Sequence, residues 1–162
     1  MIKHDNTISQ VPRRSWSRLL QAVDTGETLA LANHFSHQFH IEDIQLPESG
    51  LALLKNRDGA QGEDYFLGEI PLARAHVRIT THDHQCVEGG AQILDDRTSL
   101  ARAIAILDAI LAHELPGCEQ VQQLMAKGET SIKQQEAQRH AMLSTTRVDF
   151  SLLGNDEDEH DD

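Results

Sequence analysis

Aromatic residues and cysteines are both scarce in this sequence, and each shortage limits what the chain can be. Only 4% of its 162 residues are aromatic, so a hydrophobic core must be built mainly from aliphatic side chains. The two cysteines, Cys86 and Cys118, lie far apart and form no C-x-x-C motif, which is typical of a cytoplasmic protein without structural disulfides. The polar first residues contain no apolar run, so we expect no signal peptide.

Positive charge is also in short supply. The chain has 14 Lys and Arg against 26 Asp and Glu, which gives a formal net charge of −12 at pH 7. Nucleic-acid binding requires clustered Lys and Arg, so this composition argues against DNA or RNA as a partner. No window approaches the ~18 uninterrupted apolar residues that a membrane-spanning helix needs. We therefore expect neither nucleic acid nor a membrane as the main partner.

Recognisable catalytic motifs are missing as well. The chain has no G-x-S-x-G nucleophile elbow, no phosphate-binding G-x-x-x-x-G-K-[ST] loop and no dinucleotide-binding G-x-G-x-x-G stretch. Adjacent carboxylates occur at Asp95 and Asp96, but their place before an apolar helical pattern predicts that one of them caps a helix. From its residues alone, the sequence shows no self-sufficient active site.

What the sequence does contain is a long region of strand chemistry between residues 48 and 79. Apolar residues alternate there at the period of two that is typical of strands. The alternation changes phase between Leu72 and Ala73, beside Pro71, which predicts a bulge or a strand break. The turn-forming residues 59–62 predict the connection between antiparallel strands.

Helical patterns flank this region. The clearest follows Asp96 and ends at Pro116 and Gly117. Its apolar residues recur at helical spacing, at Leu100, Ala103, Ile104, Leu107, Ile110 and Leu111. Shorter patterns predict helices over 13–23 and from residue 25 onward. After residue 118 we expect one or two helical turns that stop at Gly128, followed by a polar helix over 130–143.

These patterns predict an α+β fold, with an antiparallel sheet packed against helices in a single domain over residues 12–153. Further strands are expected at 39–44 and at 146–152. Residues 1–11 are expected to form a flexible arm. The acidic residues 154–162 are expected to stay disordered, because like charges repel one another.

Arg74, His76 and Arg78 share one face of the strand expected at 73–79. Guanidinium groups bind phosphate, phosphonate and carboxylate groups through paired hydrogen bonds, so this face is a candidate anion- or partner-binding site. A solvated outer face of the sheet explains the same pattern. Both interpretations stand at this point.

Four possible metal ligands recur with period two, at His82, His84, Cys86 and Glu88. A strand would place all four on one side, and imidazole and thiolate are zinc ligands. The rise of a strand spreads them over ~20 Å, however, so only His82 and His84 would reach one ion. A polar surface strand is the alternative.

Three other histidines recur at every third residue, at His34, His37 and His40. A helix running through all three would place them on one side. The apolar residues Phe39 and Ile41 favour a strand instead, so these histidines are weaker ligand candidates.

Five stretches of the sequence carry a family resemblance. They are ESGL at 48–51, GEDYFLGE at 62–69, LARAHVR at 72–78, AILDA at 105–109 and TRVDF at 146–150. Together, and in this order, they resemble the PhnG family, a subunit of the bacterial carbon–phosphorus lyase system for phosphonate use. The RVDF sequence is the most specific of them.

The resemblance implies an accessory or scaffolding subunit that works with PhnH, PhnI and PhnL and assembles with PhnJ. In that family the machinery attaches the ribose 5-triphosphate moiety of ATP to an alkylphosphonate and displaces adenine, and the nucleosidase chemistry is attributed to PhnI. The chain is then expected to have no cofactor of its own, although the complex uses ATP. It is also expected to be inactive alone.

Within RVDF, Arg147 and Asp149 project outward if Val148 and Phe150 are buried, and are therefore candidate partner-binding residues. A plain surface ion pair is the alternative, and such a pair contributes little to stability.

The chain departs from the family pattern at several positions. Residues 95–97 read Asp-Asp-Arg in place of glycine, arginine and aspartate, and Leu100 and Arg102 replace a histidine and a glutamate. The arginine usual after Phe150 is absent, so contacts at these positions are expected to differ. Two other functions fit the residues alone: a small metal-binding protein using His82 and His84, and a protein-interaction domain of unrelated function.

Overall fold

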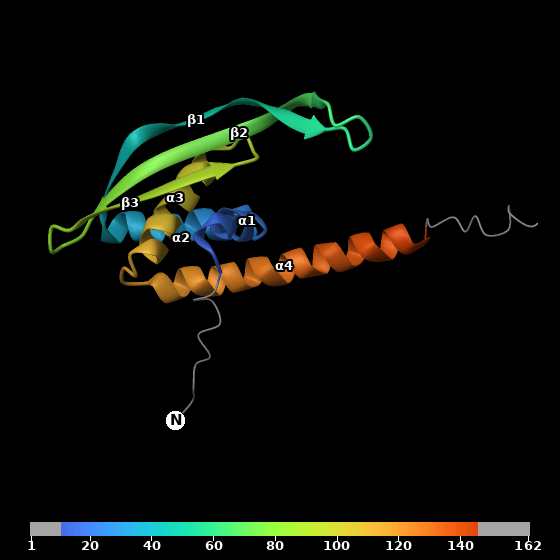
Figure 1. Ribbon diagram of the computed structural model, residues 1–162. Coiled ribbons are helices and arrows are strands. Elements are labelled where there is room, and N and C mark those ends of the chain that lie inside the picture. Colours follow the sequence, from blue (N-terminus) through green and yellow to red (C-terminus); the bar gives the residue numbers. More distant parts are fainter. Residues whose placement is uncertain (1–10, 146–162) are drawn as a thin grey trace, which may run out of the picture.

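The computed structural model describes residues 11–145 of the chain. Figure 1 shows an antiparallel sheet, in the order β1-β2-β3, with helices on one of its faces. In chain order the elements are the 3₁₀ helix η2 (Arg13–Ser15), α1 (Trp16–Gln21), α2 (Thr25–Gln38), β1 (His40–Arg57), β2 (Asp64–Thr80), β3 (Cys86–Ile93), α3 (Thr98–Ala112) and α4 (Cys118–Thr145). The predicted α+β fold class is confirmed.

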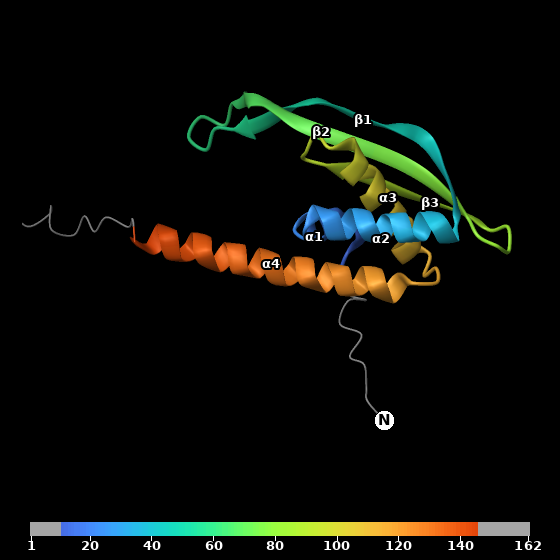
Figure 2. The ribbon, with the colours of Figure 1, turned by 180° about the vertical axis from the view of Figure 1, so that it is seen from behind.

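The core lies between the sheet and α3. Alternate residues of β2 from Ala73 to Ile79 are at most 4% exposed, as the period of two predicted. Eleven of the fifteen residues of α3 are buried, and this helix packs against β2 and β3. Burial of each of its Leu and Ile side chains contributes about 1.5–3 kcal/mol. Figure 2 shows α1 and α2 in the same layer as α3, with α4 beneath them.

Asp108 lies in the middle of this core helix and links it to two other segments. Its carboxylate accepts hydrogen bonds from Arg13 Nε (2.9 Å) and Nη2 (2.6 Å), and from the backbone N–H of Gly90 (3.0 Å). This hydrogen-bonded carboxylate raises the pKa of Arg13. Next to Gly90, β3 touches α3 so closely that a Cβ at Gly89 would lie 2.3 Å from the Ala105 carbonyl oxygen. Only glycine fits there.

β1 and β2 are single long strands rather than the shorter pieces that the sequence suggested. The predicted break between Leu72 and Ala73 is wrong, because the two strands pair without interruption there. Two of the three register shifts place extra residues in β1, and one of these spans Pro47, where an irregularity tolerates a residue without an N–H; the third, between Leu54 and Lys55, places the extra residue in β2. The change of apolar phase has another cause. On the hairpin side of Ala73, from Leu72 back to Asp64 in β2, no described residue is buried, so the apolar alternation there does not report the core.

The start of α3 also differs from the prediction. Neither Asp95 nor Asp96 caps this helix, since Arg97 holds the N-cap position and no side chain caps it. Asp95 instead accepts hydrogen bonds from the Arg97 backbone N–H (2.8 Å) and guanidinium (2.5–3.0 Å). The guanidinium lowers the pKa of Asp95 to about 2.

The predicted helix stop at Gly128 is wrong, because α4 runs without a break from Cys118 to Thr145. Gly128 lies where α4 crosses α1, and a Cβ there would stand 2.0 Å from the Leu19 carbonyl oxygen. The glycine therefore permits close packing of two helices. Past residue 132 the described side chains of α4 are all exposed.

Several sequence predictions concern residues outside the described part. They are the strand at 146–152 with Arg147 and Asp149, the arm at 1–11 apart from Val11, and the acidic segment at 154–162. Among residues 11–145, no helix combines the length and the apolar character needed to span a membrane.

Candidate functional site

Arg74, His76 and Arg78 lie on the face of β2 that points away from the helices, as predicted. Each has a carboxylate partner on a neighbouring strand. Arg74 pairs with Glu48 of β1, and Arg78 Nη2 donates to Glu88 Oε1 of β3 at 2.9 Å. His76 Nε2 lies 3.1 Å from the second oxygen of Glu88. The face is therefore a ladder of opposite charges rather than a positive patch.

This pairing decides what the open face can do. The hydrogen bond from Arg78 lowers the pKa of Glu88, and Glu88 in turn raises the pKa of Arg78, so both stay ionised near neutral pH. A free anion would have to displace the Glu48 or Glu88 carboxylate before binding either guanidinium. A protein surface with charges of both signs can instead be complementary to this face without displacing either carboxylate.

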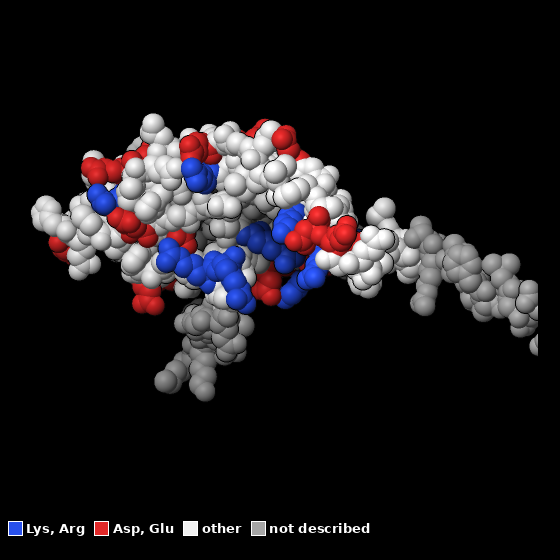
Figure 3. All heavy atoms as spheres, turned by 45° about the horizontal axis from the view of Figure 1, so that its top comes forward, with Lys and Arg blue, Asp and Glu red and all other residues white. Residues whose placement is uncertain are grey.

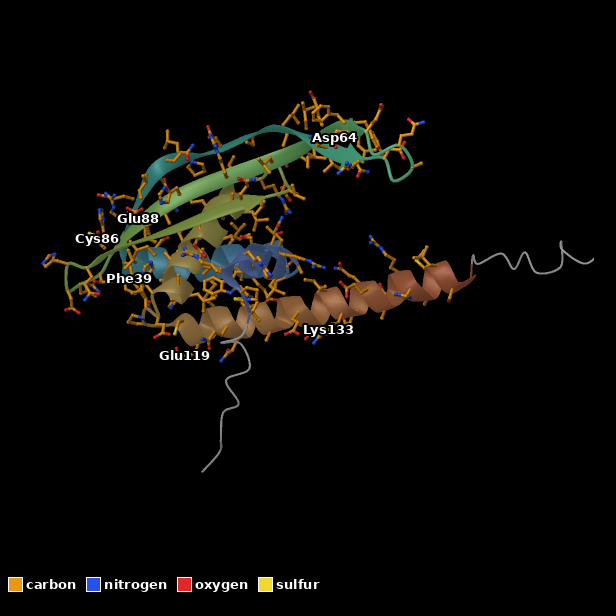
Figure 4. The ribbon with its side chains drawn as sticks, in the orientation of Figure 1. Phe39, Asp64, Cys86, Glu88, Glu119 and Lys133 are labelled. Carbon is orange, nitrogen blue, oxygen red and sulfur yellow. The ribbon has the colours of Figure 1, made fainter. Side chains whose placement is uncertain are left out.

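The metal-site hypothesis assumed that His82, His84, Cys86 and Glu88 lie on one strand, and this is wrong. His82 and His84 lie in the turn between β2 and β3, and β3 begins only at Cys86. His84 has a positive φ of 59°, so it does not continue the period of two with Glu88. Figure 4 shows Cys86 and Glu88 at this end of the sheet. Over residues 11–145, no group of three His, Cys, Asp or Glu side chains is arranged to hold a metal ion.

The other three histidines do not share one helix face. α2 carries His34 and His37 but ends at Gln38, so His40 is the first residue of β1. His34 Nε2 lies 3.0 Å from the Gln38 amide nitrogen, within the helix. His40 lies 3.2 Å from a Glu42 oxygen.

The β1–β2 hairpin extends well past the end of β3 (Figure 1). β3 pairs with β2 only from Ala73 to Thr80, so residues 50–70, here called the distal arm, form a two-stranded ribbon. No residue of the distal arm is buried. Its exposed large apolar side chains are Leu51 (67%), Leu53 (60%), Leu54 (42%), Tyr65 (44%), Phe66 (60%) and Leu67 (59%). Exposed large apolar side chains gathered on one segment mark a candidate interaction site.

Apolar side chains occupy both faces of the distal arm. Directly opposed residues on paired strands share a face, and faces alternate along each strand. Leu53 lies opposite Glu69, which is on the same side of β2 as the buried Ala73. Leu54 lies opposite Gly68 and thus belongs to the open face. Figure 4 shows Asp64 at the far end of this hairpin, away from the core.

A groove of about 360 Å³ separates α1 from the second half of α4. It is lined by Arg18, Gln21, Ala22, Ile132, Gln135, Glu136 and Arg139. Arg18 Nη2 donates to Glu136 Oε1 at 3.1 Å, so the lining is polar and of mixed charge. Figure 3 shows Lys and Arg side chains gathered in the lower middle of the face it presents.

The described residues thus offer paired charges and an aliphatic projection, and comparison with known proteins decides the family. A family model described as "Phosphonate metabolism protein PhnG" matches residues 11–154. The chain belongs to the PhnG family. The resemblance carried by the five short stretches is confirmed. The match extends through the RVDF sequence at 147–150.

A curated member of this family is similar over almost its full length. It is "Alpha-D-ribose 1-methylphosphonate 5-triphosphate synthase subunit PhnG" of Rhizobium meliloti (strain 1021). The two chains are 28% identical over 149 residues, which cover 90% of each. The name of that protein describes it as one subunit of a synthase.

Sequence reasoning found the basic residues of the open face but missed their partners and the distal arm. The pairing of Glu48 with Arg74 needed the strand register, which the misplaced break obscured. The sequence did contain a pattern that could have indicated the distal arm, since leucines at 51, 53 and 54 fall on both faces of one strand. Such a strand must be covered on both sides or left exposed.

Proposed function

We propose that this chain is an accessory subunit of an alpha-D-ribose 1-methylphosphonate 5-triphosphate synthase in organic phosphonate catabolism. The observation that carries the proposal is the family match over residues 11–154, together with the name of the R. meliloti relative. In this proposal the complex transfers the ribose 5-triphosphate moiety of ATP to an alkylphosphonate and releases adenine. The companions are homologues of PhnH, PhnI and PhnL, with PhnJ joining the assembly, in the cytoplasm.

The surface of the chain supports an assembling role more than a catalytic one. The basic residues Arg74 and Arg78 are each paired with a carboxylate, and the distal arm exposes leucines together with Tyr65 and Phe66. Paired charges and exposed leucines are suited to binding another protein. In this proposal the catalytic residues belong to the companion subunits.

Co-expression tests the proposal. The chain is produced together with the PhnH, PhnI and PhnL homologues of its own organism and run on a size-exclusion column. We expect it to elute in one peak with them. Elution of the chain as a free monomer beside an assembled remainder contradicts the proposal.

A further inference from the structure

We propose that the distal arm inserts into a groove of a companion subunit, which covers both of its faces with aliphatic side chains. The inference rests on the proposed function, because it takes the occupant to be another subunit of the synthase. It goes further by naming the contact surface and the chemistry that it meets.

The exposure of the distal arm is the first support. Residues 48–71 form an uninterrupted run without a buried side chain, and only Ala52, Asp58 and Ile70 are half-buried. β1 and β2 have 18 and 17 residues, whereas a strand of a soluble domain has about 5–6. A two-stranded hairpin with no further cover is marginally stable in water. A companion surface would supply the cover that the described residues lack.

The distribution of apolar side chains indicates insertion rather than one-sided docking. A ribbon that lies flat on a partner needs apolar residues on one face and polar residues on the other. Here Leu51 and Leu53 lie on the helix side of the ribbon and Leu54 lies on the opposite side. A groove with two walls would bury the leucines on both sides of the ribbon.

Charge favours a companion subunit over a second copy of this chain. The chain has a formal net charge of −12, so two copies repel each other. The distal arm itself carries four acidic residues, Asp58, Glu63, Asp64 and Glu69, against Lys55 and Arg57. In Figure 3 the surface over the sheet toward the hairpin is largely uncharged. Lys55 pairs with Asp64 at 2.6 Å, which leaves Asp58, Glu63 and Glu69 against Arg57. The groove is therefore apolar along its walls and carries positive charge where it receives the tip.

Three matched leucine variants test this. L53D places a charge on the helix side of the distal arm and L54D on the opposite side. L46D is the control, since Leu46 is 76% exposed on the same strand but outside the arm. Each variant is co-expressed with the PhnH, PhnI and PhnL homologues, and the affinity for the purified companions is measured alongside the melting temperature of the lone chain.

We expect L53D and L54D each to weaken binding at least tenfold, L46D to stay within twofold of wild type, and all three melting temperatures to be unchanged. If only one of the two arm variants binds the companions more weakly, the arm lies flat on a companion with one face, and insertion is overturned. Normal binding by both overturns the arm as the contact. A homodimer of the lone chain that L53D dissociates makes a second copy the occupant, which also overturns the proposal. If wild type binds no companion, the proposed function itself fails, which distinguishes the two.

Discussion

Asp108 shows how a single buried charge organises the domain. It is 5% exposed, and its carboxylate is bound by the Arg13 guanidinium and by the Gly90 backbone N–H. The first residues of the fold and the middle of β3 are thereby fixed to α3. The helical pattern placed Asp108 in an apolar helix but could not show its partners, because the two donors lie 95 and 18 residues away along the chain.

The charge on Asp108 is expected to matter for stability. D108N keeps the shape of the side chain but removes the charge, and a hydrogen bond to a charged group contributes about 1.5–3 kcal/mol. Because Arg13 is half exposed, we expect a loss near the lower end of that range. Urea unfolding of D108N against the exposed control D83N measures it. Equal midpoints for the two variants contradict the assigned role.

Asp95 gives a pH dependence with a definite sign. Its pKa is lowered from an ordinary 3.8 to about 2 by Arg97, so the folded state binds the proton less tightly than the unfolded state. The stabilisation is then fully present above about pH 4 and is lost as the pH falls toward 2. We expect D95N to be slightly less stable than wild type at pH 7, and this difference in stability to shrink as the pH falls from about 4 toward 2. Unfolding curves for both proteins at several pH values check this, and a difference that is as large at pH 2 as at pH 7 contradicts it.

At the scale of the elements, α4 depends on one close contact. G128A adds a helix-favouring residue, which in an exposed helix stabilises by about 1 kcal/mol. At this position the new Cβ meets the Leu19 carbonyl oxygen, so α1 and α4 must move apart. We expect a lower melting temperature for G128A and no loss for G50A, where a Cβ meets nothing within 4 Å. A higher melting temperature for G128A shows that the contact is dispensable.

The distal arm is expected to be separable from the core. Replacing residues 53–69 by Asn-Gly joins the opposed residues Ala52 and Ile70 through a two-residue hairpin turn. Since no residue of the arm is buried, the shortened chain should melt within a few degrees of wild type. Circular dichroism of the two proteins measures this. Unfolding of the shortened chain makes the arm part of the core.

Prediction from the sequence succeeded where burial controls the pattern and failed where it does not. Ala73, Val77 and the apolar residues of α3 face a covered core, so their spacing reports the structure directly. Leu72 lies where cover ends, and its phase was misread as a strand break. Gly128 was misread as a helix stop because a close helix crossing leaves no mark in the sequence of one helix.

The ion pairs of the candidate site were beyond sequence reasoning for a related reason. Arg74 and Glu48 meet only because the strands pair in one register, and that register includes two shifts in β1 before Glu48. A period of two places Arg74 on a face but cannot name the residue opposite. The family resemblance, in contrast, depends on the order of short motifs and needed no register.

Residues 11–145 form one core with two extensions. Figures 1 and 2 both show the distal arm and the second half of α4 projecting at the same end, beyond the layer of α1, α2 and α3. The described side chains on both extensions are exposed or at most half-buried. This shape suits a chain that holds companions at one end while its core supplies stability.

Release of adenine from ATP in the presence of methylphosphonate tests the central claim most directly. The assay compares this chain alone, the PhnH, PhnI and PhnL homologues without it, and all four together. We expect adenine from the complete set, at least tenfold less when this chain is omitted, and none from this chain alone. Turnover by the isolated chain contradicts the account, as does full activity of the companions without it.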